Sequence, residues 1–380
     1  WLKSRIGSRA EGCALAHRMA SLRPLKRLWR RGAVLAGGSG CAVLCESRFR
    51  CEGPDEAVNP PPRPAGKSRL VITGSGNSTG TPRPLCLMSR RDDPKCKISL
   101  QAMVGSPDCN RNYRGNPAML IQYSPRQDER PYNIQIDMGK TFRESALRWY
   151  PRFGVPFVDA VVLTHDHADA CMGLDELRTV QHLPLGAVPG KLAETMTEVV
   201  PVPVFAGARH MSRVQSCFPY LVPSVQAAAT VARFVAKIEW IEVHDFESFT
   251  CPGGLEITSV PVQHGKDYIC QAFVFGARDR VAYISDISAV PDKTMSYLEA
   301  KAPLDLLVLD TLLEASHAVH IGLHEAVALV RRLRPKRALL VGMSDQLEHH
   351  ATNSRLREML KGEGLDVQLA YDGLHLDVDL

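Results

Sequence analysis

The chain has 380 residues, 45% of them hydrophobic and 23% charged, which allows one large domain or two of average size. No stretch reaches the roughly 18 consecutive apolar residues that a membrane-spanning helix requires. Residues 1–70 hold 14 Lys or Arg against five acids, a local charge of +9, whereas the whole chain carries +5, so the other 310 residues carry −4. Such a mildly acidic body argues against a large nucleic-acid interface, which needs clustered cations.

The first 70 residues differ in composition from the rest. They are rich in Arg and poor in acids, and they end in the Pro-rich stretch NPPPRPAGKSR. This composition is typical of an organellar transit segment followed by a largely disordered linker. It predicts a mitochondrial or plastid protein, with a cytoplasmic one as the alternative. A leader without a targeting role, and a signal peptide or anchor on the glycine-interrupted stretch GAVLAGGSGCAVLC, are the other interpretations. The folded domain is predicted to span 71–380.

From residue 69 onward, strands and helices are predicted to alternate. Strands are expected at 69–73, 118–123, 132–139, 158–165, 202–206, 237–243, 255–264, 270–277, 280–288, 304–311, 337–344, 365–373 and 374–380. Helices are expected at 141–154, 169–181, 208–222, 322–335 and 352–362. The segment 182–201 is expected to be a surface elaboration, and GSGNSTGTP a loop. Helices between strands indicate a layered α/β fold.

Polar side chains follow five of the apolar runs directly. They are His165, His264, Asp286, Asp310 and the pair Ser344-Asp345. Strand ends that meet at one edge of a sheet bring such side chains to a single point. The sequence therefore predicts one polar site at a sheet edge.

The stretch THDHAD carries the chemistry of a metal site. Two histidines two residues apart, His165 and His167, can turn both imidazoles toward one ion, and Asp169 follows two residues later. Zinc accepts imidazole nitrogen and carboxylate oxygen, and catalytic sites keep one position open for water. With His264 and Asp286, these residues complete a set of three histidines and carboxylates.

These motifs resemble the metallo-β-lactamase superfamily. The resemblance is carried by LTHDHADACMGLDELR, VPVQHG, AYISDIS, HAVHIGLHEAV and GMSDQLEHH. Within the superfamily, the chain is similar to the group of PhnP-type phosphoribosyl cyclic phosphodiesterases, nearest to its eukaryotic, plant and fungal hydrolases. The resemblance covers about 71–380. It implies a four-layer αββα sandwich and a metal-dependent hydrolase.

The resemblance also assigns roles to residues. It implies that His165, His167 and His264 are the histidine ligands of a first metal and that Asp286 bridges two metals. Asp169 is implied to be the carboxylate of the second metal and to orient the attacking water. His320 is implied to be the general acid or a phosphate contact. Asp310 is expected to accept the other ring proton of a histidine.

Two positions depart from the superfamily pattern, which usually has histidine at both. One is Ala170, which is usual in the eukaryotic branch; the other is Asp345, which is not. Asp345 is retained as a doubtful ligand of the second metal, with His349 or His350 as substitutes. An oxygen-rich second position is weak for zinc and suits Mn²⁺ or Mg²⁺ better. We therefore expect Zn²⁺ or Mn²⁺, one ion bound tightly and a second more weakly.

The predicted activity is hydrolysis of a small phosphodiester, cyclic ones included, by metal-activated water. A non-catalytic scaffold with an incomplete second site and a thioester hydrolase are the alternatives. The expected partner is a small-molecule substrate, without nucleic acid or membrane, and a homodimer is compatible with the sequence. Backbone N–H groups of the loop GSGNSTG are a candidate phosphate cradle, although a plain turn explains that loop as well.

The cysteine spacing predicts thiols rather than a disulfide framework. The chain has 11 cysteines, a density typical of a protein in a reducing compartment. Cys171, Cys217 and Cys270 lie in apolar contexts and are expected to be buried. PhnP-like proteins hold a Cys-rich insert, with a structural zinc, where this chain has Cys86, Cys96 and Cys109. Without a Cys-x-x-Cys pair, the insert is expected to be incomplete.

Overall fold

The computed structural model describes residues 59–126, 129–183, 199–227 and 234–380. All of them belong to one compact unit that spans 49–380. Residues 1–58 of the predicted leader, and most of the predicted surface elaboration at 182–201, lie outside the described residues. Within the described ranges, no helix is long and apolar enough to cross a membrane.

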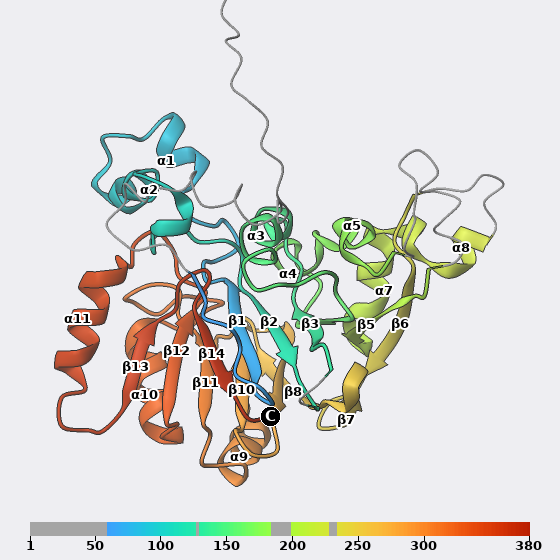
Figure 1. Cartoon of the computed structure of the whole chain (residues 1–380). Coiled ribbons are helices and arrows are strands. Elements are labelled where there is room, and N and C mark those ends of the chain that lie inside the picture. The colour runs from blue at the N-terminus through green and yellow to red at the C-terminus, as the bar shows by residue number, and fades with distance from the viewer. Residues whose placement is uncertain (1–58, 127–128, 184–198, 228–233) are drawn as a thin grey trace, which may run out of the picture. The chain divides into compact units, whose positions relative to one another are not determined.

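Two seven-stranded sheets form the centre of this unit (Figure 1). The first sheet has the order β14 (His375–Val378), β1 (Ser68–Gly74), β2 (Ala118–Tyr123), β3 (Tyr132–Ile136), β4 (Ala160–Leu163), β5 (Val202–Gly207), β6 (Ile238–Val243). The second has the order β13 (Asp366–Leu369), β12 (Arg337–Val341), β11 (Leu306–Asp310), β10 (Val281–Ile284), β9 (Ile269–Phe275), β8 (Glu256–Gln263), β7 (Ser248–Thr250).

Ten α-helices are present among the described residues. They are α1 (Pro84–Met88), α2 (Lys97–Ala102), α3 (Phe142–Trp149), α4 (Ala168–Cys171), α5 (Leu177–Val180), α7 (Ala208–Cys217), α8 (Pro223–Ala227), α9 (Asp292–Ala300), α10 (Leu323–Leu333) and α11 (His349–Met359).

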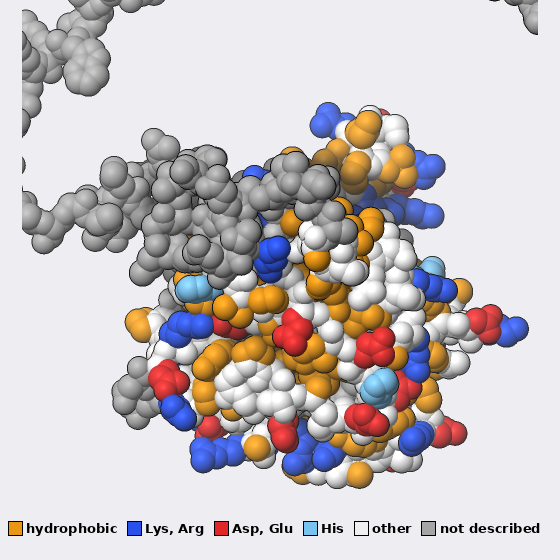
Figure 2. Space-filling view, turned by 90° about the vertical axis from the view of Figure 1, so that its right-hand side faces the viewer, with side chains coloured by type: hydrophobic (Ala, Val, Ile, Leu, Met, Phe, Trp, Pro, Cys, Tyr) orange, Lys and Arg blue, Asp and Glu red, His pale blue; other side chains and the backbone are white. Residues whose placement is uncertain are grey.

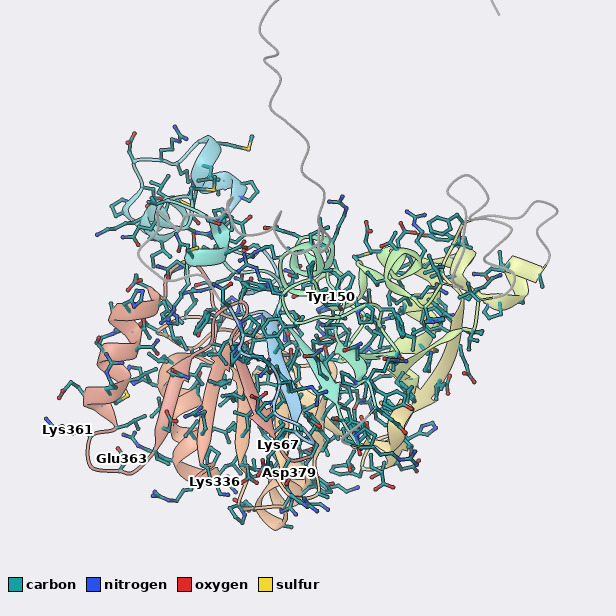
Figure 3. All side chains as sticks on the ribbon, in the orientation of Figure 1. Lys67, Tyr150, Lys336, Lys361, Glu363 and Asp379 are labelled. Atoms are coloured by element: carbon teal, nitrogen blue, oxygen red, sulfur yellow. A yellow bond between two sulfur atoms is a disulfide. The ribbon has the colours of Figure 1, made fainter. Side chains whose placement is uncertain are left out.

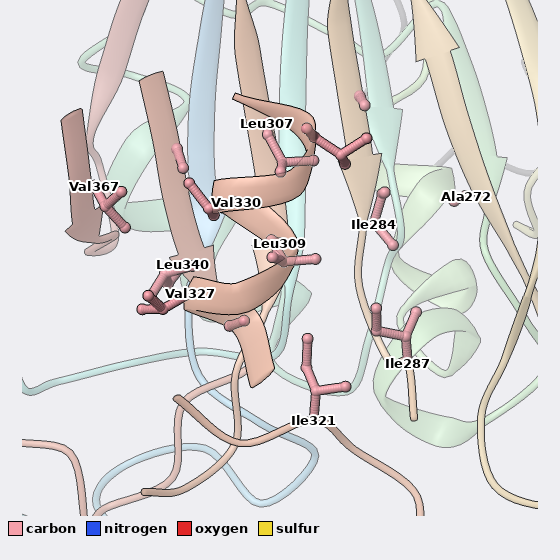
Figure 4. Packing of buried hydrophobic residues seen from close by; sticks show 14 of the residues in the cluster. Ala272, Ile284, Ile287, Leu307, Leu309, Ile321, Val327, Val330, Leu340 and Val367 are labelled. Atoms are coloured by element: carbon pink, nitrogen blue, oxygen red, sulfur yellow. The ribbon is translucent and has the colours of Figure 1, made fainter. Parts of the chain in front are cut away.

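Three apolar clusters show that the elements are stacked in four layers. Between the sheets, side chains such as Ile72 and Ile134 pack with Phe273 and Tyr283. A second cluster joins the other face of the second sheet to α9, α10 and α11; Figure 4 shows Val327 and Val330 of α10 with Leu309 and Leu340 of the strands. A third cluster joins the first sheet to α3 and α7. Because successive side chains of a strand point to opposite faces, each sheet presents apolar side chains both to the other sheet and to its helix layer. The predicted αββα sandwich is confirmed.

An ion pair joins the neighbouring strands β14 and β1 at one edge of the first sheet. Lys67 precedes β1 and Asp379 follows β14, and the Lys67 ammonium lies 3.4 Å from the Asp379 carboxylate (Figure 3). Both side chains are partly exposed, so this pair adds little stability.

The prediction of one continuous helix over 169–181 is wrong. The chain instead forms α4, a 3-10 turn at Leu174–Glu176 and α5. The break lies at Gly173, whose N–H donates to the Met138 carbonyl at 2.6 Å. A β-carbon at Gly173 would lie 2.5 Å from the Gly139 carbonyl oxygen. This close approach of two backbones, which periodicity does not reveal, ends the helix.

The prediction of free thiols is wrong for Cys86 and Cys96, which form a disulfide. This bond ties α1 to the 3-10 turn that precedes α2. Cys171 and Cys270 are buried, as predicted, whereas Cys217 at the end of α7 is exposed. An apolar neighbourhood in sequence does not reveal which side of a helix end faces solvent.

Candidate metal centre

The strand order brings the predicted site residues to one edge. Strands β10, β11 and β12 are parallel, and β8 has the same direction because β9 lies antiparallel to both β8 and β10. The carboxyl ends of these four strands therefore point the same way. From the first sheet, the end of β4 joins this edge where the Gln271 N–H donates to the Thr164 carbonyl at 2.8 Å.

Two overlapping groups of side chains lie at this edge. The first contains His165, His167 and His264, and the second contains His264, Asp286 and His320. Within each group, one ligand atom per residue lies within 4.8 Å of the others. The structure thus brings together five of the predicted site residues in the geometry of a metal site. Their function as ligands or acid stays a prediction.

The tautomer of His165 follows from its neighbours. The Thr164 hydroxyl donates its only hydrogen to the Asp137 carboxylate at 2.8 Å, and the Thr164 N–H donates to the same carboxylate at 2.8 Å. With Asp137 ionised, the Thr164 oxygen, 2.8 Å from Nδ1 of His165, accepts a hydrogen bond from that nitrogen. Nε2 of His165 keeps its lone pair, and it is buried without a hydrogen-bond partner among the described atoms.

His264 and His320 are held in the same way. Nδ1 of His264 lies 2.8 Å from the Val319 carbonyl, and Nδ1 of His320 lies 2.8 Å from the Asp310 carboxylate. Both partners only accept, so both Nδ1 atoms donate. The expected hydrogen bond from a histidine to Asp310 is confirmed, and His320 is the donor. Metal-binding histidines characteristically use their second nitrogen in this manner.

Two buried carboxylates complete the edge. Asp286 follows β10 in a left-handed conformation, with φ of 53°, and is almost fully buried. Burial, followed by the nearby charges of Asp169 and Asp310, raises its pKa well above the usual range. Asp169, also buried, lies in α4 with a carboxylate oxygen 4.0 Å from Nε2 of His165. A cation bound between these carboxylates would remove the repulsion that raises the pKa of Asp286.

The imidazoles differ in their affinity for protons. Burial, followed by the neighbouring imidazoles, lowers the pKa of His165 well below its usual value, and burial together with His320 lowers that of His264 to about 4. For His320, burial opposes the charged form, but the hydrogen bond and charge of Asp310 outweigh it and raise the pKa to about 9. Neutral His165 and His264 are in the state that a metal requires.

The residues present fit a divalent cation. His165 offers an orphaned buried nitrogen, His264 a lone pair fixed by its Nδ1 donor bond, and His167 lies in the same group. With Asp169 and Asp286 beside them, this nitrogen-rich set suits zinc or manganese.

Asp345 is in neither group. Its Oδ2 accepts from the Arg83 guanidinium at 2.8 Å and from the Ser99 hydroxyl at 2.7 Å, and its Oδ1 is buried without a hydrogen-bond partner among the described atoms. His349 is buried at the start of α11 with its Nε2 3.1 Å from the Asn353 amide, and it is in neither group. The structure gives Asp345 a partner in the segment that carries the disulfide, and we leave it out of the candidate centre.

The loop after β1 does not offer the expected row of free N–H groups. The N–H groups of Ser75, Gly76, Asn77, Thr79 and Gly80 all donate to atoms of the protein. In this loop the interpretation as a plain turn holds, and the phosphate cradle is a wrong expectation.

Sequence reasoning missed Asp137, Thr164 and Tyr268. Asp137 directly follows β3, so the same signal that singled out the other strand-end residues was present. Tyr268 stacks on His167 with ring centroids 4.5 Å apart. Nothing in its sequence context distinguishes it from any other half-buried tyrosine.

A family profile described as "Beta-lactamase superfamily domain" matches residues 132–343, more than half of the chain. The chain belongs to the metallo-β-lactamase superfamily. Within that superfamily it is PhnP-like: it is 29% identical to a crystal structure described as a new diphosphatase from the PhnP family, with a TM-score of 0.60. That match covers 82% of this chain and 97% of the diphosphatase.

Two other proteins are similar to the chain in fold or in part of its sequence. Zn²⁺-bound PqqB from Methylobacterium extorquens is 17% identical, with a TM-score of 0.56, and the match covers 82% of this chain and all of that one. It shows that this superfamily member shares the PqqB fold. An octanoyltransferase of Porphyromonas gingivalis is 31% identical over 114 residues, 30% of this chain. The match spans only 18% of that protein's length.

Proposed function

We propose that this superfamily member is a metal-dependent hydrolase that cleaves a small phosphodiester. The observation that carries the proposal is the buried, unpartnered Nε2 of His165, which lies in one group with His167 and His264. Thr164 holds the ring of His165, and the Val319 carbonyl holds that of His264. His210 and His349 also have an unpartnered buried ring nitrogen, but only that of His165 belongs to a group of potential ligands. The 29% identity to a PhnP-family diphosphatase over most of both chains supports phosphorus as the electrophile.

The proposed cation has His165, His167 and His264 as nitrogen ligands, with Asp286 and Asp169 as oxygen ligands. When bound there, it would supply Lewis acidity toward the substrate and lower the pKa of a water molecule. A second metal position has fewer candidate ligands than expected, because Asp345 is bonded to Arg83. We therefore propose one tight ion, with any second ion held weakly by Asp286 and Asp169.

Two side chains of the protein carry out the two proton transfers of the proposed reaction. The Asp169 carboxylate orients the attacking water and accepts its proton. His320, held by Asp310 and charged at neutral pH by virtue of its raised pKa, donates a proton from Nε2 to the leaving oxygen. The face shown in Figure 2 mixes Lys and Arg with Asp and Glu and so lacks the continuous basic surface of a nucleic-acid interface.

The test is hydrolysis of bis(p-nitrophenyl) phosphate by the purified chain with and without added Mn²⁺ or Zn²⁺. We expect metal-stimulated turnover that His167→Ala reduces to the buffer rate, whereas His244→Ala, an exposed histidine outside the site, leaves it unchanged. A diphosphate and a thioester are assayed alongside. Equal rates for wild type and His167→Ala would reject the proposal, and turnover of the thioester alone would favour the acyl hydrolase.

A separate variant decides between the two roles open to His320. If His320 is the acid, His320→Asn lowers kcat by about 10²–10⁴-fold and retains the bound metal. If it is chiefly a ligand, the variant loses metal as well. Metal content measured on the same sample as kcat distinguishes the two.

A further inference from the structure

His167 differs from the other histidines of the candidate centre in how its ring is held. His165, His264 and His320 each donate from Nδ1 to a protein oxygen. Within the part of the chain that the structure describes, no hydrogen bond reaches the ring of His167, and this is the exposed member of its group. Within the protein, only packing contacts are available to orient this imidazole.

The contact that does so is an aromatic stack. The rings of His167 and Tyr268 are 4.5 Å apart and inclined by only 19°. The other close rings, those of His165 and His264, meet His167 edge-on at 4.6 Å and 5.3 Å. A face-to-face neighbour restricts rotation of the imidazole about its Cβ–Cγ bond, while both edge contacts come from the other proposed ligands themselves.

Tyr268 is in turn fixed by the loop that carries the histidines. Its hydroxyl donates to the carboxylate of Asp166, the residue between His165 and His167. Nδ1 of His210 lies 3.2 Å from the other oxygen of that carboxylate. The Tyr268 carbonyl accepts the N–H of His264 at 2.8 Å. One tyrosine thus contacts the segments that deliver all three imidazoles of the first group.

We propose that Tyr268 is a positioning residue for His167, replacing by stacking the hydrogen bond that the other imidazoles have. The inference rests on the proposed metal centre. A ring held in place before the ion arrives loses less freedom when it binds, so the stack raises metal affinity. Partners that orient metal-binding histidines commonly account for about 10–100-fold in affinity.

The test measures the affinity of the metal-free chain for Zn²⁺ by competition with a chromophoric chelator. Tyr268→Leu removes the aromatic face and is expected to weaken Zn²⁺ binding by about 10–100-fold. Tyr268→Gln, a polar residue suited to a half-buried position, is expected to behave like Tyr268→Leu. Tyr268→Phe keeps the face and loses only the hydroxyl's bonds with Asp166 and His210, so its affinity is expected to stay within about threefold of wild type.

Tyr220→Leu is the matched control, because Tyr220 is also half-buried and its hydroxyl donates to an aspartate, Asp175, away from the centre. Co²⁺ absorption spectra of each variant report the geometry at the ion, which a general loss of stability would not alter. Unchanged Zn²⁺ affinity in Tyr268→Leu and Tyr268→Gln overturns the inference and leaves the proposed function standing. A wild-type chain that binds no Zn²⁺ overturns both.

Discussion

The Thr164 hydroxyl lies 2.8 Å from Nδ1 of His165 and donates its own hydrogen to Asp137. With Asp137 ionised, this relationship places the proton of His165 on Nδ1 and leaves the lone pair of Nε2 free for an ion. Asp137 adopts a left-handed backbone conformation, with φ of 57°, directly after β3, and it is fully buried. An unusual conformation at a buried carboxylate is consistent with a functional constraint.

Removing the Thr164 hydroxyl should therefore weaken metal binding. Thr164→Val leaves Nδ1 of His165 and one oxygen of Asp137 without partners, and we expect Zn²⁺ affinity to fall by about 10–100-fold. Thr164→Ser keeps the hydroxyl and should restore most of that affinity. Chelator competition measures both, with Thr258→Val on the exposed face of β8 as control. Equal affinity in Thr164→Val and Thr164→Ser would contradict this account of His165.

Asp345 should matter for folding and not for metal. Its side chain is fully buried, whereas Arg83 is partly exposed. Arg83→Ala leaves the buried carboxylate with the Ser99 hydroxyl as its remaining donor, and we expect the free energy of unfolding to fall by about 1–3 kcal/mol. Urea denaturation measures this loss. Asp345→Asn should leave Zn²⁺ affinity within about twofold of wild type, because Asp345 lies outside the candidate centre. Loss of the tight metal in Asp345→Asn would restore Asp345 as a ligand.

Stability should decrease in mild acid because of His349. Burial, then the charges of Arg114 and Arg111, lowers the pKa of His349 to about 2, so the folded chain keeps this imidazole neutral. The unfolded chain takes up a proton below pH of about 6.5, and the free energy of unfolding therefore falls as the pH falls. The expected contribution is about 1.4 kcal/mol between pH 7.5 and 5.5.

Denaturation of wild type and His349→Gln at both pH values measures this contribution. The variant should lose less stability on acidification than wild type, whereas His244→Gln, at an exposed position, should follow wild type. Identical pH dependence of wild type and His349→Gln would show that His349 is charged in the folded chain.

Much of the site was predictable because it lies where strands end. Apolar runs that stop at a polar residue identified His165, His264, Asp286 and Asp310, and their convergence follows from parallel strands in one sheet. Asp137 carries the same signal, after β3. These residues are local features of the strands that hold them, which is why a sequence reveals them.

The remainder depends on contacts between distant segments. The position of Asp345 after β12 looked equivalent to the others, but its direction is set by Arg83 and Ser99, about 250 residues earlier in the chain. The interruption at Gly173 depends on the backbone of Gly139. The role proposed for Tyr268 depends on the ring of His167, on which it stacks. Periodicity and spacing carry none of this information, because each case depends on a partner brought close by the fold.

The central claim is that His165, His167 and His264 hold one divalent cation tightly. Elemental analysis of the purified wild-type chain and of His167→Ala, after dialysis with and without added Zn²⁺ or Mn²⁺, tests it most directly. We predict about one equivalent of metal per chain in wild type and a large loss in His167→Ala, with further uptake by wild type only at high Mn²⁺. Metal content near zero in wild type under every condition would contradict the account and favour a scaffold without a metal centre.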